Sequence, residues 1–262
     1  MRAVSLLDVL GFRKRVQTTP LPELAQSYET AIRNAHALNN PPDIAPNHPQ
    51  LFSSRDRSDR WCLQHIFSDT IVLVSLSDDE ASCLKLIVHT WRLSQALLGF
   101  QMPVRGAMTF GELHVNKPLN IFVGKALTDA YELEQAQEWI GVAIDDSLVS
   151  ACPSIFSVAS REGNILAAML PRYPVPLKGG EPREMVTVNW RWNLIVERGT
   201  RSLLPAAEDD ASRRKIENTE SYLQAVVAAG LTYAAQPGAI PAELQTFWVG
   251  EREPPFAHGD DL

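Results

Sequence analysis

Apolar and polar residues alternate along most of the chain in short runs that predict strands and helices in turn. Residues 61–76 are the clearest run, because apolar, aromatic and β-branched residues flank a two-residue polar break, Ser68 and Asp69. This pattern is typical of two strands joined by a tight hairpin. The predicted hairpin therefore carries a carboxylate at its tip.

Further runs extend this pattern on both sides of the hairpin. Apolar residues recur at helical spacing in three stretches, 21–38, 78–99 and 124–138. Strands are expected near the N-terminus as far as Asp8, and over residues 102–115 (with a glycine bend at Gly111), 140–144, 165–170 and 185–196. The alternation predicts the α/β class, as an α+β sandwich in which helices cover a mixed sheet.

Two stretches differ from this alternation. Residues 39–60 hold several prolines and then a charged run, which predicts a long surface loop. Residues 204–235 predict one long helix, acidic at its start, basic in the middle at 213–215, and apolar near its end. We therefore expect a domain over residues 1–200 and a helical C-terminal extension and tail over residues 201–262.

Composition limits the classes of function. A chain of 262 residues with 45% hydrophobic content can bury one large core, and its net charge of −7 disfavours nucleic-acid binding through a general basic field. The three cysteines form no CxxC motif, which favours buried thiols in a reducing compartment. No apolar run is long enough for a membrane span or a signal peptide. We expect a cytoplasmic protein with neither nucleic-acid nor membrane partners.

Two acidic residues stand at predicted strand ends. Asp8 ends the apolar run of residues 5–8, just before Gly11 and a presumed helix start, and Asp69 lies in the hairpin. Acidic strand ends that meet across a sheet form a metal site suited to a phosphate substrate. The alternative is local, with Asp69 as a turn residue and Asp8 as a helix cap.

The order of these segments resembles the class III nucleotidyl cyclase catalytic domain. The resemblance rests on a strand ending DVLGF, a hairpin carrying FSD, a strand VRGAMTFG, a helix opening GKALTDAYELE, and LKGGEP before a late strand. It spans roughly residues 1–196, which makes residues 1–200 a cyclase catalytic domain. The forms VRGAMTFGE and VGKALTDAYELE are most similar to the Pycsar anti-phage cyclases, which make cUMP or cCMP as alarm signals.

The resemblance implies a phosphorus–oxygen lyase that converts UTP to 3',5'-cyclic UMP and pyrophosphate. In this chemistry the ribose 3'-oxygen attacks the α-phosphate with the help of two divalent cations, Mn²⁺ or Mg²⁺. The implied metal ligands are Asp8 and Asp69, with the Val9 carbonyl as a further oxygen. Gly11 would let the backbone approach the phosphates at a helix start. Phe12 would line the substrate site, although a core position is the commoner role for a phenylalanine.

Two positions bear on the choice of base. The purine cyclases of the family read the base four residues before the second metal Asp, here His65, and three residues before the third helix's glycine, here Ile121. Ile121 cannot accept a hydrogen bond from the adenine amine, a loss of about 1–3 kcal/mol. His65 can donate to uracil O4, which favours UTP over CTP, but a neutral imidazole can also accept. A half-buried strand histidine is the structural alternative, and cytidylate or adenylyl cyclase activity are the functional ones.

The third helix departs from the family pattern. Thr128 and Glu132 stand where the family has an Asn that orients the ribose and an Arg that stabilises the transition state. Thr128 can still bond a ribose hydroxyl, but a glutamate cannot supply positive charge. Three cations are candidates to replace the arginine: Lys125, Arg105 and Lys178.

Each of these candidates has a structural alternative. Arg105 could form an ion pair with an acid such as Glu134, and Lys125 could be a solvated helix position. If no cation replaces the arginine, the domain would bind nucleotide and metal without turnover, as an inactive scaffold.

The resemblance also implies a head-to-tail homodimer with shared active sites. In that arrangement the acid pair of one subunit faces the third helix and the Lys178 loop of the other. The extension after residue 201 would brace this dimer, which is one hypothesis for its role.

Overall fold

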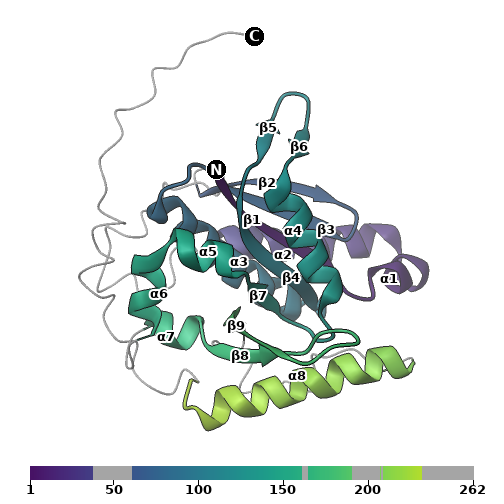
Figure 1. The fold of residues 1–262 in the computed structure, drawn as a ribbon. Helices are drawn as coiled ribbons and strands as arrows, with labels where there is room; N and C mark the ends of the chain where they lie inside the picture. The colour runs from purple at the N-terminus through teal and green to yellow at the C-terminus, as the bar shows by residue number, and fades with distance from the viewer. Residues whose placement is uncertain (38–60, 161–164, 191–206, 208, 232–262) are drawn as a thin grey trace.

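A seven-stranded sheet forms the centre of the molecule (Figure 1). The computed structural model describes residues 1–37, 61–160, 165–190, 207 and 209–231. The strand order is β2-β3-β1-β4-β7-β9-β8, and every neighbouring pair is antiparallel except β4 and β7. The sheet strands are β1 (Arg2–Val9), β2 (Cys62–Phe67), β3 (Thr70–Ser75), β4 (Val104–Gly111), β7 (Val142–Ile144), β8 (Arg172–Val175) and β9 (Arg183–Val188). A separate two-stranded hairpin pairs β5 (His114–Asn116) with β6 (Ile121–Val123).

Helices cover both faces of the sheet, which confirms the predicted fold class. They are α1 (Phe12–Thr18), α2 (Leu21–Ala37), α3 (Glu80–Gly99), α4 (Lys125–Ala136), α5 (Asp146–Ala151), α6 (Pro153–Ala159), α7 (Ile165–Met169) and α8 (Asp210–Ala228). Successive residues of a strand point to opposite faces. Leu7 of β1 accordingly packs with α2, α3 and α6, while Leu6 packs with α4. On the α4 side, α8 covers the half of the sheet formed by β7, β9 and β8.

The hairpin at residues 61–76 is confirmed. β2 and β3 pair in register around Ser68 and Asp69, and Ser68 has a φ of 57°. Small polar residues tolerate this left-handed conformation in tight turns. The turn places Asp69 directly before Thr70, the first residue of β3.

The helix predicted at 78–99 is also confirmed, as α3. Its N-cap is Asp79, whose carboxylate accepts a hydrogen bond from the Ser82 amide at 2.7 Å. The helix is buried along most of its length, so it forms the main contact between the sheet and α2.

Some predicted elements differ from the structure. The strand expected at 165–170 is wrong, because Ile165–Met169 form the helix α7. A short apolar run does not distinguish a buried strand from a buried helix, and its alanines, leucine and methionine favour the helix. The strand expected at 102–115 is two strands, β4 and β5, and the one expected at 185–196 is β9, which ends at Val188. Residues 39–60, 191–196 and the tail lie outside the described residues.

The helix predicted at 204–235 corresponds to α8, which is shorter. It begins at Asp210 and ends at Ala228. Asp209 caps it in a reciprocal capping box with Ser212. Its buried residues Tyr222, Leu223 and Val226 pack against a cluster that includes Trp139 and Trp190. Residues 209–231 are thus packed on the same sheet as the rest of the described chain.

Two further expectations can be compared with the described residues. Cys62, Cys83 and Cys152 are all buried and form no disulfide, which confirms buried free thiols. Within the described ranges, none of the helices has the length and apolar character needed to span a bilayer.

Candidate active site

Asp8 and Asp69 lie next to each other at one end of the central strands. β1 runs between β3 and β4, and Asp8 pairs in register with Thr70 on one side and Arg105 on the other. The Val9 amide donates a hydrogen bond to the Asp69 carbonyl at 2.9 Å, which ties the hairpin tip to the end of β1. Both acids are half-buried. The sheet therefore brings together two residues that are far apart in the sequence.

The surroundings of Asp8 disfavour its negative charge. Burial, and then the charge of Glu134, raise the pKa of Asp8 to about 6; Arg105 opposes this effect, and Asp69 adds to it. A divalent cation would relieve both the desolvation and the repulsion between the acids. Carboxylate oxygens are the ligands that Mg²⁺ and Mn²⁺ prefer, so the donor set fits these ions.

The acid pair would supply only part of a coordination shell. Within the described ranges, no group of three or more His, Cys, Asp and Glu residues is arranged to hold a metal ion. Mg²⁺ commonly uses one or two carboxylates and completes its shell with water and substrate phosphates. The pair is thus suited to an ion that arrives with a phosphate substrate. The role of the Val9 carbonyl stays a prediction.

The turn between β1 and α1 depends on a glycine. Gly11 has a φ of 74°, in the left-handed region, and precedes α1 without a side-chain cap. A side chain here would be strained whatever the space around it. The Phe12 ring lies 5.6 Å from the Tyr28 ring and packs against the core. Phe12 thus packs against the core, as its alternative role requires, and its contact with a substrate stays a prediction.

Tyr28 is a polar residue near the acid pair that the sequence did not indicate. Its hydroxyl is buried and has no hydrogen-bond partner among the described residues. Burial raises the pKa of Tyr28, and the charges of Asp69 and Asp8 raise it further. In the sequence Tyr28 is one of several apolar positions of a helix, so nothing marked its hydroxyl as part of this region.

The two positions expected to read the base lie on β2 and on the β5–β6 hairpin, which contact each other. The His65 ring on β2 lies 5.5 Å from the ring of Phe122, the residue after Ile121 on β6. The His65 side chain is half-buried, and Ile121 is 42% exposed. The hairpin of β5 and β6 thus lies beside β2, and an apolar side chain stands open to a ligand or partner.

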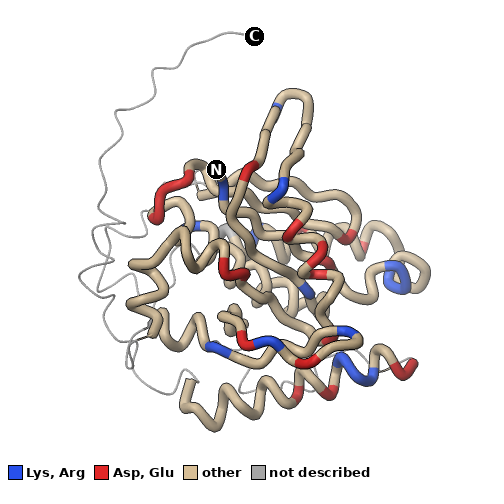
Figure 2. Tube along the Cα trace, viewed as in Figure 1, with Lys and Arg blue, Asp and Glu red and all other residues tan. Residues whose placement is uncertain are grey.

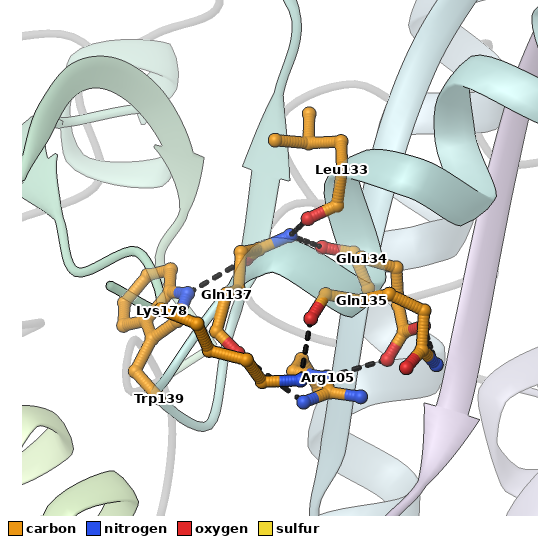
Figure 3. A network of polar contacts seen from close by, with 8 residues as sticks. Arg105, Leu133, Glu134, Gln135, Gln137, Trp139 and Lys178 are labelled. Carbon is orange, nitrogen blue, oxygen red and sulfur yellow. Dashed lines mark hydrogen bonds and ion pairs between the residues drawn. The ribbon is translucent and has the colours of Figure 1, made fainter. Parts of the chain in front are cut away.

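Arg105 forms the structural ion pair that was its alternative role (Figure 3). Its Nε lies 2.5 Å from Oε1 of Glu134, and its Nη1 donates to the Gln137 carbonyl at 3.2 Å. The side chains are 5% and 1% exposed. Much of the positive charge of Arg105 is therefore compensated within the fold.

Gln137 holds this ion pair in a larger polar network. Its Nε2 donates to the carbonyls of Gly106 and Leu133 at 2.9 and 3.0 Å, and its Oε1 accepts from Trp139 Nε1 at 2.7 Å (Figure 3). These three partners lie on β4, in α4 and just after α4. The network therefore fixes the end of α4 against β4.

The Lys178 loop is attached to the same network. Lys178 Nζ donates to the Gln135 carbonyl at 2.6 Å, and Gln135 Nε2 donates to Glu134 Oε2 at 2.7 Å (Figure 3). Lys178 is exposed, unlike Arg105. The loop thus presents a cation at the surface from a position set by the buried ion pair.

Lys125 and Thr128 lie on the exposed start of α4. Lys125 Nζ pairs with Asp129 Oδ2 at 2.5 Å, one helical turn away. The Thr128 hydroxyl donates to the Gly124 carbonyl at 3.4 Å. Among the described residues, neither side chain forms a hydrogen bond or an ion pair with Asp8 or Asp69. Within one chain these two residues are therefore separate from the acid pair.

Lys215 of α8 is a second residue that sequence reasoning missed. It is close enough to Asp8, Arg105 and Lys178 for their charges to affect its pKa. The basic run at 213–215 was visible in the sequence, but only the docking of α8 shows which of its members faces this region.

Comparison with known proteins gives structural neighbours only. No protein-family model and no curated protein matches the chain. Solved structures with a similar arrangement include the adenylyl cyclase CyaB from P. aeruginosa, at 11% identity and a TM-score of 0.43, covering 72% of this chain and 93% of that one. A second is the catalytic core of a rhodopsin-guanylyl cyclase with converted specificity in complex with ATPαS (13% identity, TM-score 0.42, 72% and 94% covered). A third comes from adenylate cyclases of Trypanosoma brucei in their monomeric state (10% identity, TM-score 0.42, 72% and 87% covered).

These similarities concern the fold alone.

Proposed function

We propose that this protein is a nucleotide cyclase that converts UTP to 3',5'-cyclic UMP and pyrophosphate, as a signal in bacterial anti-phage defence. The observation that carries the proposal is the acid pair. Asp8 and Asp69, which the cyclase-like motifs DVLGF and FSD predict as metal ligands, lie at adjacent strand ends and share one electrostatic environment. The anti-phage role rests on the sequence resemblance alone.

The acid pair would hold the divalent cations, Mn²⁺ or Mg²⁺. When bound, these ions would neutralise triphosphate charge and lower the pKa of the ribose 3'-hydroxyl. The chain's own part is to keep the two carboxylates in place. The hydrogen bond from the Val9 amide to the Asp69 carbonyl does this by joining the hairpin to β1. With a pKa of about 6, Asp8 is mainly ionised at neutral pH and available as a ligand.

The choice of a pyrimidine rests on His65 and Ile121. A donor from the His65 ring to uracil O4 favours UTP, and CTP is the next choice because the neutral ring can also accept. The exposed Ile121 side chain offers no acceptor to an adenine amine. Adenylyl cyclase activity is for this reason a weaker alternative.

A shared site in a homodimer would account for the separation of Lys125 and Thr128, at the start of α4, from the acid pair. Several large apolar side chains are exposed around the β5–β6 hairpin and α4, namely Leu119, Ile121, Val123 and Tyr131. Contiguous apolar groups at a surface favour a protein partner. In the proposed head-to-tail dimer, this region and Lys178 of one subunit would face Asp8 and Asp69 of the other.

A second candidate function is nucleotide binding without turnover. It is favoured by the pairing of Arg105 with Glu134 and by the exposed Glu132 at the position of the family's arginine. Such a scaffold would bind nucleoside triphosphate and metal at the acid pair but would release no pyrophosphate.

Incubation of the purified protein with each of the four nucleoside triphosphates and Mn²⁺ or Mg²⁺ separates these candidates. We expect cyclic UMP and pyrophosphate from UTP, with loss of both products in Asp69→Asn. Asp146→Asn, at an exposed acid in the first turn of α5, is the matched control and should keep activity. A product from ATP alone would reject the pyrimidine assignment, and nucleotide binding without any product would favour the scaffold.

A further inference from the structure

Tyr28 lies on the face of α2 that packs against the sheet. Ala31 and Ala35, three and seven residues further along the helix, share this face and are buried in the main core. The Tyr28 ring lies 5.6 Å from the ring of Phe12, the first residue of α1, which begins just after β1. The tyrosine is therefore held beside the end of β1, where the acid pair lies.

The Tyr28 hydroxyl is a buried donor that has no acceptor. It is shielded from solvent and has no hydrogen-bond partner among the described residues. A buried polar group without a partner is costly and uncommon in native proteins. Burial, and then the charges of Asp69 and Asp8, raise the pKa of Tyr28, so the hydroxyl keeps its proton at neutral pH. It can therefore donate to an anionic oxygen that comes within reach.

Asp69 offers the complementary group. Within the described ranges its carboxylate forms no hydrogen bond or ion pair, although its backbone carbonyl accepts from the Val9 amide at 2.9 Å. Asp69 also raises the pKa of Tyr28 more than Asp8 does. Asp8 is the less suitable acceptor, because its neighbours Leu7 and Val9 face the α2 side of the sheet and successive strand residues point to opposite faces.

The described acids that are close to Tyr28 in the chain offer no other acceptor. Glu23 and Glu29 of α2 are exposed, and Glu29 pairs with Arg33 at 3.1 Å. α1, which packs on the tyrosine ring, carries basic residues and no acid (Figure 2). A donor without an acceptor and a carboxylate without a donor thus lie in the same region.

We propose that Tyr28 is a positioning residue for the cation site, and that its hydroxyl donates a hydrogen bond to the Asp69 carboxylate when this carboxylate holds a divalent cation. A carboxylate has two oxygens, so one can bind the ion while the other accepts the hydrogen bond. Carboxylates that bind metal ions are commonly oriented by such partners. The inference rests on the proposed function for the cation, and it concerns only the acid-bearing half of the site, within one chain.

The test is a titration of the full-length protein with Mn²⁺ alone, in which electron paramagnetic resonance measures the free ion. Tyr28→Phe keeps the ring that packs on Phe12 and removes only the hydroxyl. We expect this variant to bind Mn²⁺ about tenfold more weakly than the wild type. Without metal it should unfold at the same temperature as the wild type or a higher one, because the lost hydroxyl has no partner there. A role in packing alone would leave the Mn²⁺ affinity unchanged.

The matched control is Tyr222→Phe, which removes another buried tyrosine hydroxyl. Tyr222 belongs to the cluster around Trp139, and its hydroxyl accepts a hydrogen bond from Thr187 at 3.4 Å. Because this hydroxyl has a partner within the fold, its loss should leave the unfolding temperature equal to or below that of the wild type. The Mn²⁺ affinity of the control should change by less than about twofold.

The inference is overturned if the wild type does not bind Mn²⁺, or if Tyr28→Phe binds it as tightly as the wild type. It is also overturned if both tyrosine variants lose affinity equally, or if metal-free Tyr28→Phe unfolds at a lower temperature than the wild type. If Mn²⁺ binding depends on the Tyr28 hydroxyl while no nucleoside triphosphate gives a cyclic product, the positioning role stands and the proposed reaction fails.

Discussion

Asp8 illustrates a conflict between stability and function at a single residue. Its pKa in the folded protein is about 6, above its ordinary value of 3.8. The folded state therefore binds this proton more tightly than the unfolded state. The resulting stabilisation is complete below about pH 3.8 and is lost as the pH rises through about 6. At neutral pH the charged side chain makes the fold less stable, as ligand sites often do.

Replacing Asp8 by asparagine should for this reason stabilise the metal-free protein at neutral pH. We expect the free energy of unfolding in urea to rise by about 1–2 kcal/mol at about pH 7.5, a value reduced for the partial exposure of the side chain. The gain should vanish near about pH 4, where wild-type Asp8 is itself largely protonated. The same variant should form no cyclic product. An unchanged stability at neutral pH would mean that burial does not penalise this charge.

The buried ion pair gives a second prediction at the residue scale. Glu134→Gln removes the carboxylate that pairs with the Arg105 guanidinium, and both side chains are almost fully buried. We expect a loss of about 3 kcal/mol or more in the free energy of unfolding. Glu132→Gln, an exposed position in the same helix, should change it by less than about 0.5 kcal/mol. Similar values for the two variants would contradict a stabilising role for the pair.

Among the elements, α8 is the one whose packing on the sheet was least evident from the sequence. Tyr222 is fully buried, and its ring lies 4.8 Å from that of Trp139 and 4.9 Å from that of Tyr173. Tyr222→Ala should destabilise the protein by about 3–5 kcal/mol and change the fluorescence of the buried tryptophans. Val227→Ala, at a residue that is 46% exposed on the same helix, is the control and should have little effect. If both variants unfold like the wild type, α8 does not stabilise the sheet.

Local patterns predicted the elements whose signals are strong. The polar break at Ser68 and Asp69 defined the hairpin, and the acids before α3 defined its start, since turns and caps require particular residues. The apolar run that forms α7 carried no such signal, so it was assigned to a strand. Helices with clear caps and spacing were thus predictable from the sequence. Whether a short buried run forms a helix or a strand was not.

Residues of the candidate site were predictable only where the chemistry of the residue type allows few roles. Asp8 and Asp69 stood out as acids at strand ends, and Glu134 was named as one acid that could pair with Arg105. Tyr28 and Lys215 did not, because their place beside the acid pair follows from the docking of α2 and α8, which no local pattern encodes.

At the scale of the whole molecule, the proposed dimer makes the active site depend on two chains. An Asp69→Ala chain and a Lys178→Ala chain would each lack one half of every site. Mixing them should restore activity to about a quarter to a half of the wild-type value, because a heterodimer regains one intact site. The measurement is cyclic UMP formation after mixing, with each variant alone as the control. No recovery from folded, dimeric variants would argue against a shared site or against a role for Lys178.

The central claim is that Asp8 and Asp69 together hold divalent ions over the triphosphate of a nucleotide. Its most direct test is a crystal structure with a non-hydrolysable UTP analogue and Mn²⁺, in which anomalous scattering locates the manganese. The account predicts manganese bound by both carboxylates and by the phosphates of the analogue. Carboxylates that point apart, with no manganese between them, would contradict it.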